Sequence, residues 1–340
     1  MTTPPLNQAP SRRDRAIVAA IIAGVVATLA PITDAGGDFM QLWAGARALL
    51  VGQDPYAAVG PDSPIRWPWP LYYPVPALLP AVPFTLLSLG VARVVWVSTL
   101  WGVFAYAVTA QGWWGLLACL HLSFLVAGQV GQLVVLLAVG LLIPAFGGVA
   151  AGKPTTGLAT ILGAADRRSA LTMIVGAFAL LLLSFVFDPG WVPRWLESVR
   201  HRPHMQPLVT RPWGWLVLVA ALRWRLPAGR VVCATALVPT TLAAHDLLPA
   251  LIALRPTKQE LLPLVVLSLA AAPAHYAPAD NPDRVLYSAR LMPWLLWSVW
   301  LPLVGCILRR PNVGPVPRWL EMALARWPVW LRGRPANGSA

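Results

Sequence analysis

Residues 170–187 read ALTMIVGAFALLLLSFVF, an eighteen-residue run without a charged side chain. A transmembrane helix needs roughly 17–25 predominantly apolar residues, so this run is long enough to cross a bilayer. Comparable apolar runs occupy residues 16–31, 91–110, 130–146 and 291–308. We interpret the first of them as a membrane segment and not as a signal peptide, because no small-residue cleavage site follows it. The chain is therefore predicted to be a polytopic membrane protein.

The composition supports this interpretation and excludes two other classes. Of the 340 residues, 57% are hydrophobic and 11% are charged, and the mean hydropathy is +0.63. Soluble domains have roughly 45–50% apolar and about 25% charged residues, and disordered chains are more polar still. The net charge of +13 does not indicate nucleic-acid binding. The basic residues of the chain flank apolar runs, as the positive-inside rule predicts. We therefore expect membrane lipids and no nucleic acid as partners.

The predicted fold class is all-α, a polytopic membrane helical bundle of about 9–11 transmembrane or re-entrant helices. A single membrane domain is expected over residues 16–310. Residues 1–15 are predicted to be a cytoplasmic tail, since arginines precede the first span. Residues 311–340 alternate Trp, Leu and Arg and are predicted to form a basic amphipathic tail against anionic lipid.

Residues 34–73 are predicted to form the first extracytoplasmic loop, because they contain four acidic and two basic side chains. Within this loop, apolar residues of the segment 39–51 recur every three or four positions, which predicts an interfacial helix ending at Gly52. A crossing would follow from Pro74 to about Leu89. Arg93 would then begin the next span from the cytoplasmic side.

Histidine and cysteine patterns predict neither a metal site nor a bound cofactor. The three cysteines, Cys119, Cys233 and Cys306, each lie inside an apolar run and show no pairing or metal-binding spacing. The five histidines are scattered along the chain and form no cluster with cysteines or carboxylates.

Asp38 follows the first span and begins the predicted interfacial helix. A carboxylate at this place would suit a general base that takes one substrate from the bilayer and another from water. Aspartate is also a frequent N-cap residue, and from the spacing alone the capping role is the stronger interpretation.

Three further groups place polar side chains inside apolar stretches. Gln129 and Gln132 are amides that would either bind backbone groups of a neighbouring helix or hold a phosphate or sugar hydroxyl. Lys153 precedes Pro154, a residue that favours the start of a helix, so its ammonium would suit a phosphate or extend toward the interface. His245 and Asp246 lie in the middle of a run, where they indicate a functional site or a pair joining two helices.

Several of these motifs together resemble glycosyltransferase family 87, the polyprenyl-phosphate-mannose-dependent membrane mannosyltransferases of the GT-C type. The resemblance rests on Asp38-Phe39, WAGARALL at 43–50, GQDPY at 52–56, YYPVPAL at 72–78, Gly128-Gln129, Lys153-Pro154, and Pro239 with His245-Asp246. It is dense between Asp34 and Leu162 and identifies the chain as a short, divergent member.

The resemblance implies an all-helical membrane fold whose site faces the extracytoplasmic side of a bacterial plasma membrane. Asp38 would be the catalytic base. The donor would be a polyprenyl-phosphate-linked sugar, with mannose as the expected hexose, and the acceptor a glycolipid or glycan. No cofactor is implied. The residues expected to bind the donor phosphate or sugar are Lys153, Gln129, Arg47, His245, Asp246, Tyr72 and Tyr73.

Two other functions remain open at this stage. Broken helices and buried polar residues also suit a transporter or flippase of lipid-linked or polar solutes. A non-catalytic protein of envelope assembly would carry the same apolar pattern.

Overall fold

The computed structural model describes residues 10–33, 35–67, 69–200, 206–240, 243–276, 284–314 and 328. Nearly all of these residues that have regular structure are helical, which confirms the all-α class. The predicted C-terminal tail falls outside the described residues from 315 onward, apart from Pro328. Within the predicted N-terminal tail of residues 1–15, the first helix already starts at Arg12, and the Ser11 hydroxyl caps it by accepting a hydrogen bond from the Asp14 amide.

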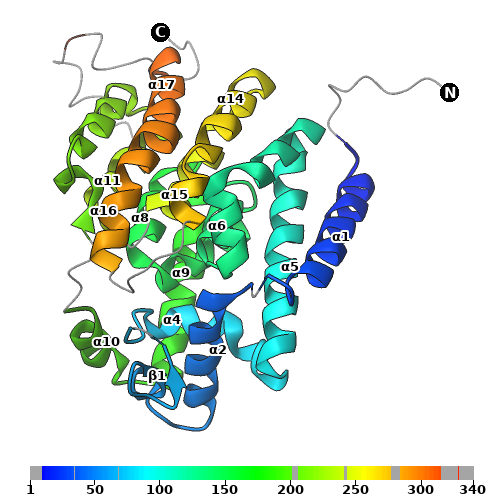
Figure 1. Ribbon diagram of the computed structural model, residues 1–340, viewed down its shortest axis with the longest axis vertical. Coiled ribbons are helices and arrows are strands. Elements are labelled where there is room, and N and C mark those ends of the chain that lie inside the picture. Colours follow the sequence, from blue (N-terminus) through cyan, green and yellow to red (C-terminus); the bar gives the residue numbers. More distant parts are fainter. Residues whose placement is uncertain are drawn as a thin grey trace.

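The chain folds into many short helices and a few long ones, with the long helices α1 and α5 side by side at one edge of the molecule (Figure 1). The α-helices are α1 (Arg12–Leu29), α2 (Gly37–Leu50), α3 (Pro55–Ala58), α4 (Val75–Leu78), α5 (Leu89–Val108), α6 (Leu122–Val130), α7 (Val134–Gly140), α8 (Pro154–Leu162), α9 (Arg167–Phe187), α10 (Trp191–Arg200), α11 (Pro227–Leu237), α12 (Ala243–Asp246), α13 (Leu248–Leu254), α14 (Lys258–Leu269), α15 (Ala272–Tyr276), α16 (Arg284–Leu295) and α17 (Leu301–Arg309). Tighter 3₁₀ turns form η1 (Leu79–Leu86), η2 (Thr109–Gln111), η3 (Trp113–Leu120), η4 (Pro144–Gly152), η5 (Leu208–Thr210) and η6 (Gly214–Arg223), and η7 (Leu296–Trp300) is a π-helix. Two short strand pairs complete the described elements: β1 (Val59–Gly60) runs parallel to β2 (Ile65–Arg66), and β3 (Gln206–Pro207) antiparallel to β4 (Pro239–Thr240).

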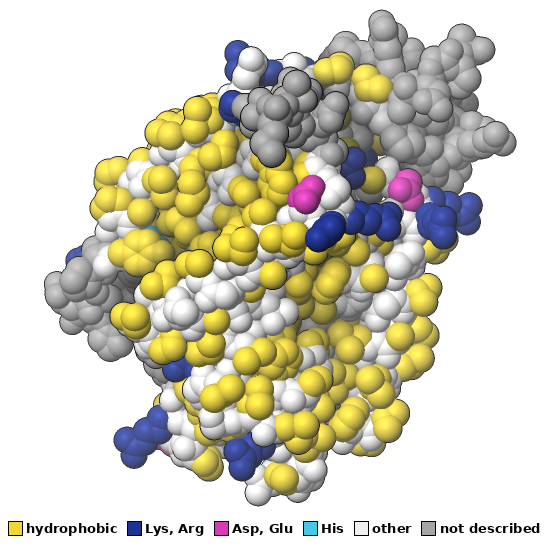
Figure 2. All heavy atoms as spheres, turned by 90° about the vertical axis from the view of Figure 1, so that its right-hand side faces the viewer, with side chains coloured by type: hydrophobic (Ala, Val, Ile, Leu, Met, Phe, Trp, Pro, Cys, Tyr) yellow, Lys and Arg dark blue, Asp and Glu magenta, His cyan; other side chains and the backbone are white. Residues whose placement is uncertain are grey.

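Three of the described helices are long and apolar enough to cross a membrane, and a fourth crossing is possible if η3 and α6, bent by 71°, form one span. The three spans are Leu89–Gln111, Arg167–Phe187 and Arg290–Arg309. These helices indicate a membrane protein, and Figure 2 shows hydrophobic side chains over much of one face, with Lys and Arg above and below them. The expected 9–11 crossings stay a prediction, because other apolar runs form helices shorter than a span.

Helices α1 and α5 form an antiparallel pair. The Arg15 guanidinium donates to the Tyr106 carbonyl at one end (2.6 Å), and the Arg93 side chain donates to the Ala35 carbonyl at the other (2.8 Å). Arg93 therefore lies at the end where α1 finishes, so a cytoplasmic N-terminus and a span that Arg93 begins from the cytoplasmic side cannot both hold. Prolines interrupt the preceding apolar run, so residues 75–86 form the short α4 and η1 and not a crossing.

Helix α2 forms where the apolar spacing predicted a helix, but it is not an interfacial helix. Phe39 and Ala46 are fully buried, and on the whole helix only Arg47 and Leu50 are exposed. Its neighbours α4, α5 and η1 cover it, and the Phe39 ring stacks on Trp96 at 4.8 Å. Helix α2 is thus surrounded by protein on nearly every side.

Helices α6 and α7 are separated by a break at Gly131, whose φ is +76°. A Cβ at this residue would lie 3.1 Å from both the Phe39 Cβ and the Trp96 Cδ1. The Trp96 indole donates to the Gly131 carbonyl (2.9 Å), and the Gly36 amide donates to the Gln129 carbonyl (2.6 Å). The break between α6 and α7 therefore lies against the start of α2, and the polar side chains of these two segments are brought close together.

One end of the bundle is rich in arginine. The Arg223 side chain donates to the Arg310 carbonyl (2.6 Å), Arg230 donates to the Leu162 carbonyl (2.7 Å), and Arg310 donates to Leu254. Each guanidinium thus binds a carbonyl at or just past the end of a helix. In Figure 1, the start of α1, helix α14 and the end of α17 lie toward this end, whereas α2, α10 and β1 lie at the opposite one.

We predict that Gly131→Ala lowers the unfolding free energy by about 1–3 kcal/mol. The backbone at this residue is left-handed, which disfavours a side chain, and the new Cβ would make tight contacts with Phe39 and Trp96. Gly24→Ala is the matched control, since Gly24 lies inside α1 with nothing within 4 Å of its Cβ position. Thermal unfolding in detergent micelles measures both variants. Equal stability of the two would contradict the packing described for Gly131.

Candidate active site

Asp38 lies in the first turn of α2, but it does not cap that helix. The N-cap residue is Gly36, and no side-chain hydrogen bond caps this end. The Asp38 carboxylate instead accepts a short hydrogen bond from the Gln132 side-chain amide and a longer one from Gln41 (3.4 Å). The capping interpretation is therefore wrong, and the carboxylate is directed toward the break between α6 and α7.

Gln132 connects the two charged parts of the site. Its nitrogen donates to Asp38, and its oxygen accepts from the Tyr73 hydroxyl (3.1 Å) and from the Lys153 ammonium (3.5 Å). The residue is 5% exposed and follows Gly131 directly, so the left-handed turn fixes where the amide projects. Because an amide is both donor and acceptor, it can face a carboxylate on one side and an ammonium on the other.

Lys153 and Asp246 form a buried ion pair with a separation of 2.6 Å between Nζ and Oδ1. The side chains are 13% and 1% exposed. Lys153 is the N-cap residue of α8, and Pro154 occupies the first helical position, as the sequence predicted. Asp246 ends α12 at a break before α13. Thr156 donates to the same carboxylate oxygen (3.1 Å), so the buried charge has two donors.

His245 completes the cluster beside Asp246. Its Nε2 lies 3.7 Å from the Asp246 Oδ1, and the imidazole is 2% exposed. The cluster thus extends from Asp38 through Gln132 and Lys153 to Asp246 and His245. It joins four segments that are far apart in the chain, and it places one ammonium between two carboxylates.

Three of the predicted donor-binding residues have other contacts. Arg47 is exposed, and its guanidinium lies over the Trp43 ring at 5.3 Å. Nine residues separate it from Asp38, which corresponds to the opposite face of α2 and about 13 Å along its axis. The Gln129 side-chain oxygen accepts a hydrogen bond from Tyr276 (3.1 Å). Tyr72 is half-buried, and its carbonyl accepts a hydrogen bond from the Trp195 indole (3.0 Å).

Helix α10 is hydrogen-bonded to the segment that carries Tyr73. The Trp195 indole binds the Tyr72 carbonyl, and the Ser198 hydroxyl donates to the Leu71 carbonyl (2.7 Å). Arg194 at the start of the same helix pairs with Asp188 and with Asp54, the N-cap residue of α3. Helix α10 therefore holds the end of the predicted first loop in the position from which Tyr73 reaches Gln132.

Sequence reasoning had not assigned Gln41 or Thr156 to the site and had left Gln132 without a definite role. Gln41 and Thr156 each follow a predicted site residue, Asp38 or Lys153, by three positions, which is the spacing of neighbours on one helix face. That signal was available. The position of Gln132 depends on the turn at Gly131, which the spacing did not specify.

Within the described ranges, no group of three His, Cys, Asp or Glu side chains is arranged to hold a metal ion. Comparisons with protein-family models, curated proteins and solved structures found no match. The fold and the site thus define a mostly helical protein with helices long enough to span a membrane and with a buried polar cluster.

We predict that Asp246→Asn lowers the unfolding free energy by about 3–5 kcal/mol, because it leaves the Lys153 ammonium buried beside a neutral amide. The double variant Lys153→Met/Asp246→Leu should recover part of the loss, since it removes both charges. The exposed pair Glu197–Arg200 gives the control, and Glu197→Gln should change stability by less than about 1 kcal/mol. Denaturant unfolding in detergent measures these values, and similar losses for the two single variants would contradict a buried ion pair.

Proposed function

We propose that the protein is an integral membrane glycosyltransferase that transfers a hexose, with mannose as the leading candidate, from a polyprenyl-phosphate-sugar donor to a glycolipid or glycan acceptor. The proposal depends mainly on one observation: Asp38 and Lys153 contact the same side chain, Gln132, from opposite sides. A base and a cation held this close would suit attack on a sugar whose leaving group is a phosphate. The motif resemblance to glycosyltransferase family 87 supports the same activity.

Asp38 would act as the general base in a single inverting displacement. The acceptor hydroxyl would transfer its proton to the Asp38 carboxylate while its oxygen forms a bond to the anomeric carbon of the donor. The bond from that carbon to the phosphate oxygen would break in the same step, and the polyprenyl phosphate would leave with the electron pair. Gln132 and Gln41 donate to the carboxylate, and these hydrogen bonds would hold it in place for the proton transfer.

Lys153 would stabilise the negative charge that develops on the leaving phosphate, and this kind of fixed charge is often the largest contribution to catalysis. Asp246 would act as a positioning residue, because its ion pair holds the Lys153 ammonium beside Gln132. His245, beside the pair, would add a second donor near the phosphate when it is protonated. Tyr73 would hold the Gln132 oxygen.

The extracytoplasmic side is the proposed location of this chemistry. Arginine-rich ends of membrane proteins face the cytoplasm, and α1 starts toward the arginine-rich end of this bundle. Asp38 follows the opposite end of α1, where the predicted outer loop begins. A polyprenyl donor in the outer leaflet would then meet a water-borne or lipid-linked acceptor at the same face.

A transporter of lipid-linked or polar solutes is the second candidate. It is favoured by the helix breaks at Gly131 and between α12 and α13, because discontinuous helices around buried charges are typical of transporter sites. Solute uptake by proteoliposomes, without formation of any glycosylated product, would favour this function over sugar transfer.

We predict that Asp38→Asn reduces sugar transfer by about 10²–10⁴-fold and that Lys153→Met reduces it by about 10²–10³-fold. Asp62→Asn and Lys258→Met are matched controls, because both residues are exposed, and each should keep the parental rate within about twofold. Purified protein, polyprenyl-phosphate-mannose and a panel of glycolipid acceptors provide the assay. Transfer by Asp38→Asn at the parental rate would exclude Asp38 as the base.

A further inference from the structure

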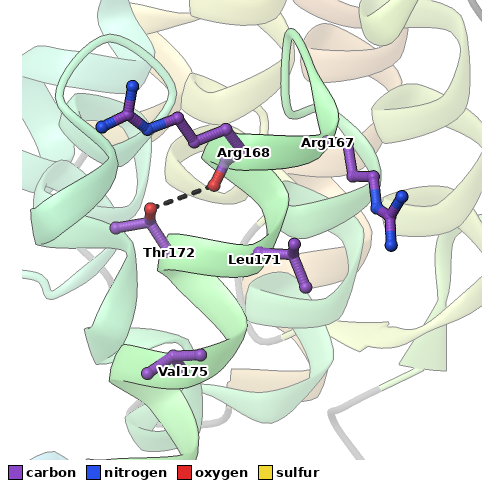
Figure 3. A pocket seen from close by; sticks show the side chains of 5 residues that line it. All are labelled: Arg167, Arg168, Leu171, Thr172 and Val175. Atoms are coloured by element: carbon purple, nitrogen blue, oxygen red, sulfur yellow. Dashed lines mark hydrogen bonds between the residues drawn. The ribbon is translucent and has the colours of Figure 1, made fainter.

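The first two turns of α9 line a shallow, open surface groove of about 560 Å³. Its lining residues are Arg167, Arg168, Leu171, Thr172 and Val175. Figure 3 shows the two arginines on either side of the helix end, with Leu171 and Val175 below them along the same helix. The Thr172 hydroxyl donates to the Arg168 carbonyl (3.0 Å), so its polar atom is satisfied within the helix.

The groove has one basic end and one apolar end. Both arginines are exposed, and Leu171 and Val175 are 48% and 64% exposed. The carboxylate nearest in sequence, Asp166, accepts hydrogen bonds from the Ser169 amide (2.8 Å) and hydroxyl (3.0 Å). About 10 Å of helix separates Arg168 from Val175, so a ligand that contacts both must carry an anionic group followed by an apolar chain.

Helix α9 is also the least covered of the three candidate spans. Only 11% of its most apolar window is buried, compared with 56% for each of the other two. It packs against η4 through Gly148 and Gly176, where a Cβ on Gly176 would lie 3.0 Å from the Gly148 Cα. The remaining faces of a membrane-spanning helix this exposed would contact lipid.

We propose that this groove binds an anionic phospholipid, whose phosphate lies between Arg167 and Arg168 and whose acyl chain runs along Leu171 and Val175. The charge of the groove selects the headgroup, and its apolar stripe selects an amphiphile over a free anion. Since these arginines flank the bilayer segment, the lipid belongs to the leaflet at the Arg167 end of α9. The site is separate from the cluster around Lys153, and it holds whether or not the protein transfers sugar.

The test titrates detergent-solubilised protein with phosphatidylglycerol or phosphatidylcholine of equal chain length and counts bound lipid by native mass spectrometry. We expect one phosphatidylglycerol to bind in preference to phosphatidylcholine. Arg167→Gln/Arg168→Gln should weaken that binding about thirtyfold, since each basic residue at a membrane surface gives roughly a fivefold preference for anionic lipid. Leu171→Asn/Val175→Asn should weaken it as well.

Arg12→Gln/Arg13→Gln is the matched control, because these arginines are also exposed, in the first turn of α1, and have one aspartate beside them. It should leave phosphatidylglycerol binding unchanged. Equal weakening by the two double arginine variants would overturn the proposal in favour of general surface charge. Displacement of the lipid by millimolar inorganic phosphate, or equal binding of phosphatidylcholine, would overturn it too. An unchanged melting temperature of each variant confirms that α9 remains folded.

Discussion

The ion pair between Lys153 and Asp246, extended through Gln132 to Asp38, is the interaction on which the arrangement of this protein depends. Isolated charges are very unfavourable in an apolar interior, so each of them needs a partner held in a fixed place. Four segments supply those partners: the start of α2, the turn between α6 and α7, the start of α8 and the end of α12. Packing of these helices is therefore linked to pairing of these side chains.

The irregular backbone of the bundle follows from the same requirement. In a continuous helix the backbone amides and carbonyls bond to each other, and the side chains project only at regular intervals. The break at Gly131 presents Gln132, the proline after Lys153 starts a new helix at the ammonium, and the interruption after Asp246 ends a helix at the carboxylate. Each break occurs where a polar side chain meets the cluster. Backbone that departs from helical geometry in the interior of the bundle is satisfied by protein, as the Gly36 and Trp96 hydrogen bonds illustrate.

The sequence predicted the class of fold and much of the cluster, because both depend on local signals. Apolar runs gave the helices, and Lys153, His245 and Asp246 stood out as ionisable residues within such runs. The environment of α2 was not predictable in this way, since an apolar stripe has the same spacing whether lipid or protein covers it. Arg47 lies away from the cluster although it is close to Asp38 in sequence, because an offset of nine residues along a helix turns a side chain to the opposite face. The crossing expected from Pro74 to about Leu89 is interrupted, because four prolines between residues 74 and 83 shorten what composition presents as a span.

The coupling between Asp38 and Lys153 tests the central claim most directly, because these residues are 115 positions apart and both contact Gln132. The measurement is a double-mutant cycle of Asp38→Asn and Lys153→Met on the free energy of unfolding in detergent. A shared cluster predicts an interaction free energy of about 0.5–3 kcal/mol between the two substitutions. Additive effects, within about 0.3 kcal/mol, would contradict a single site that contains both charges.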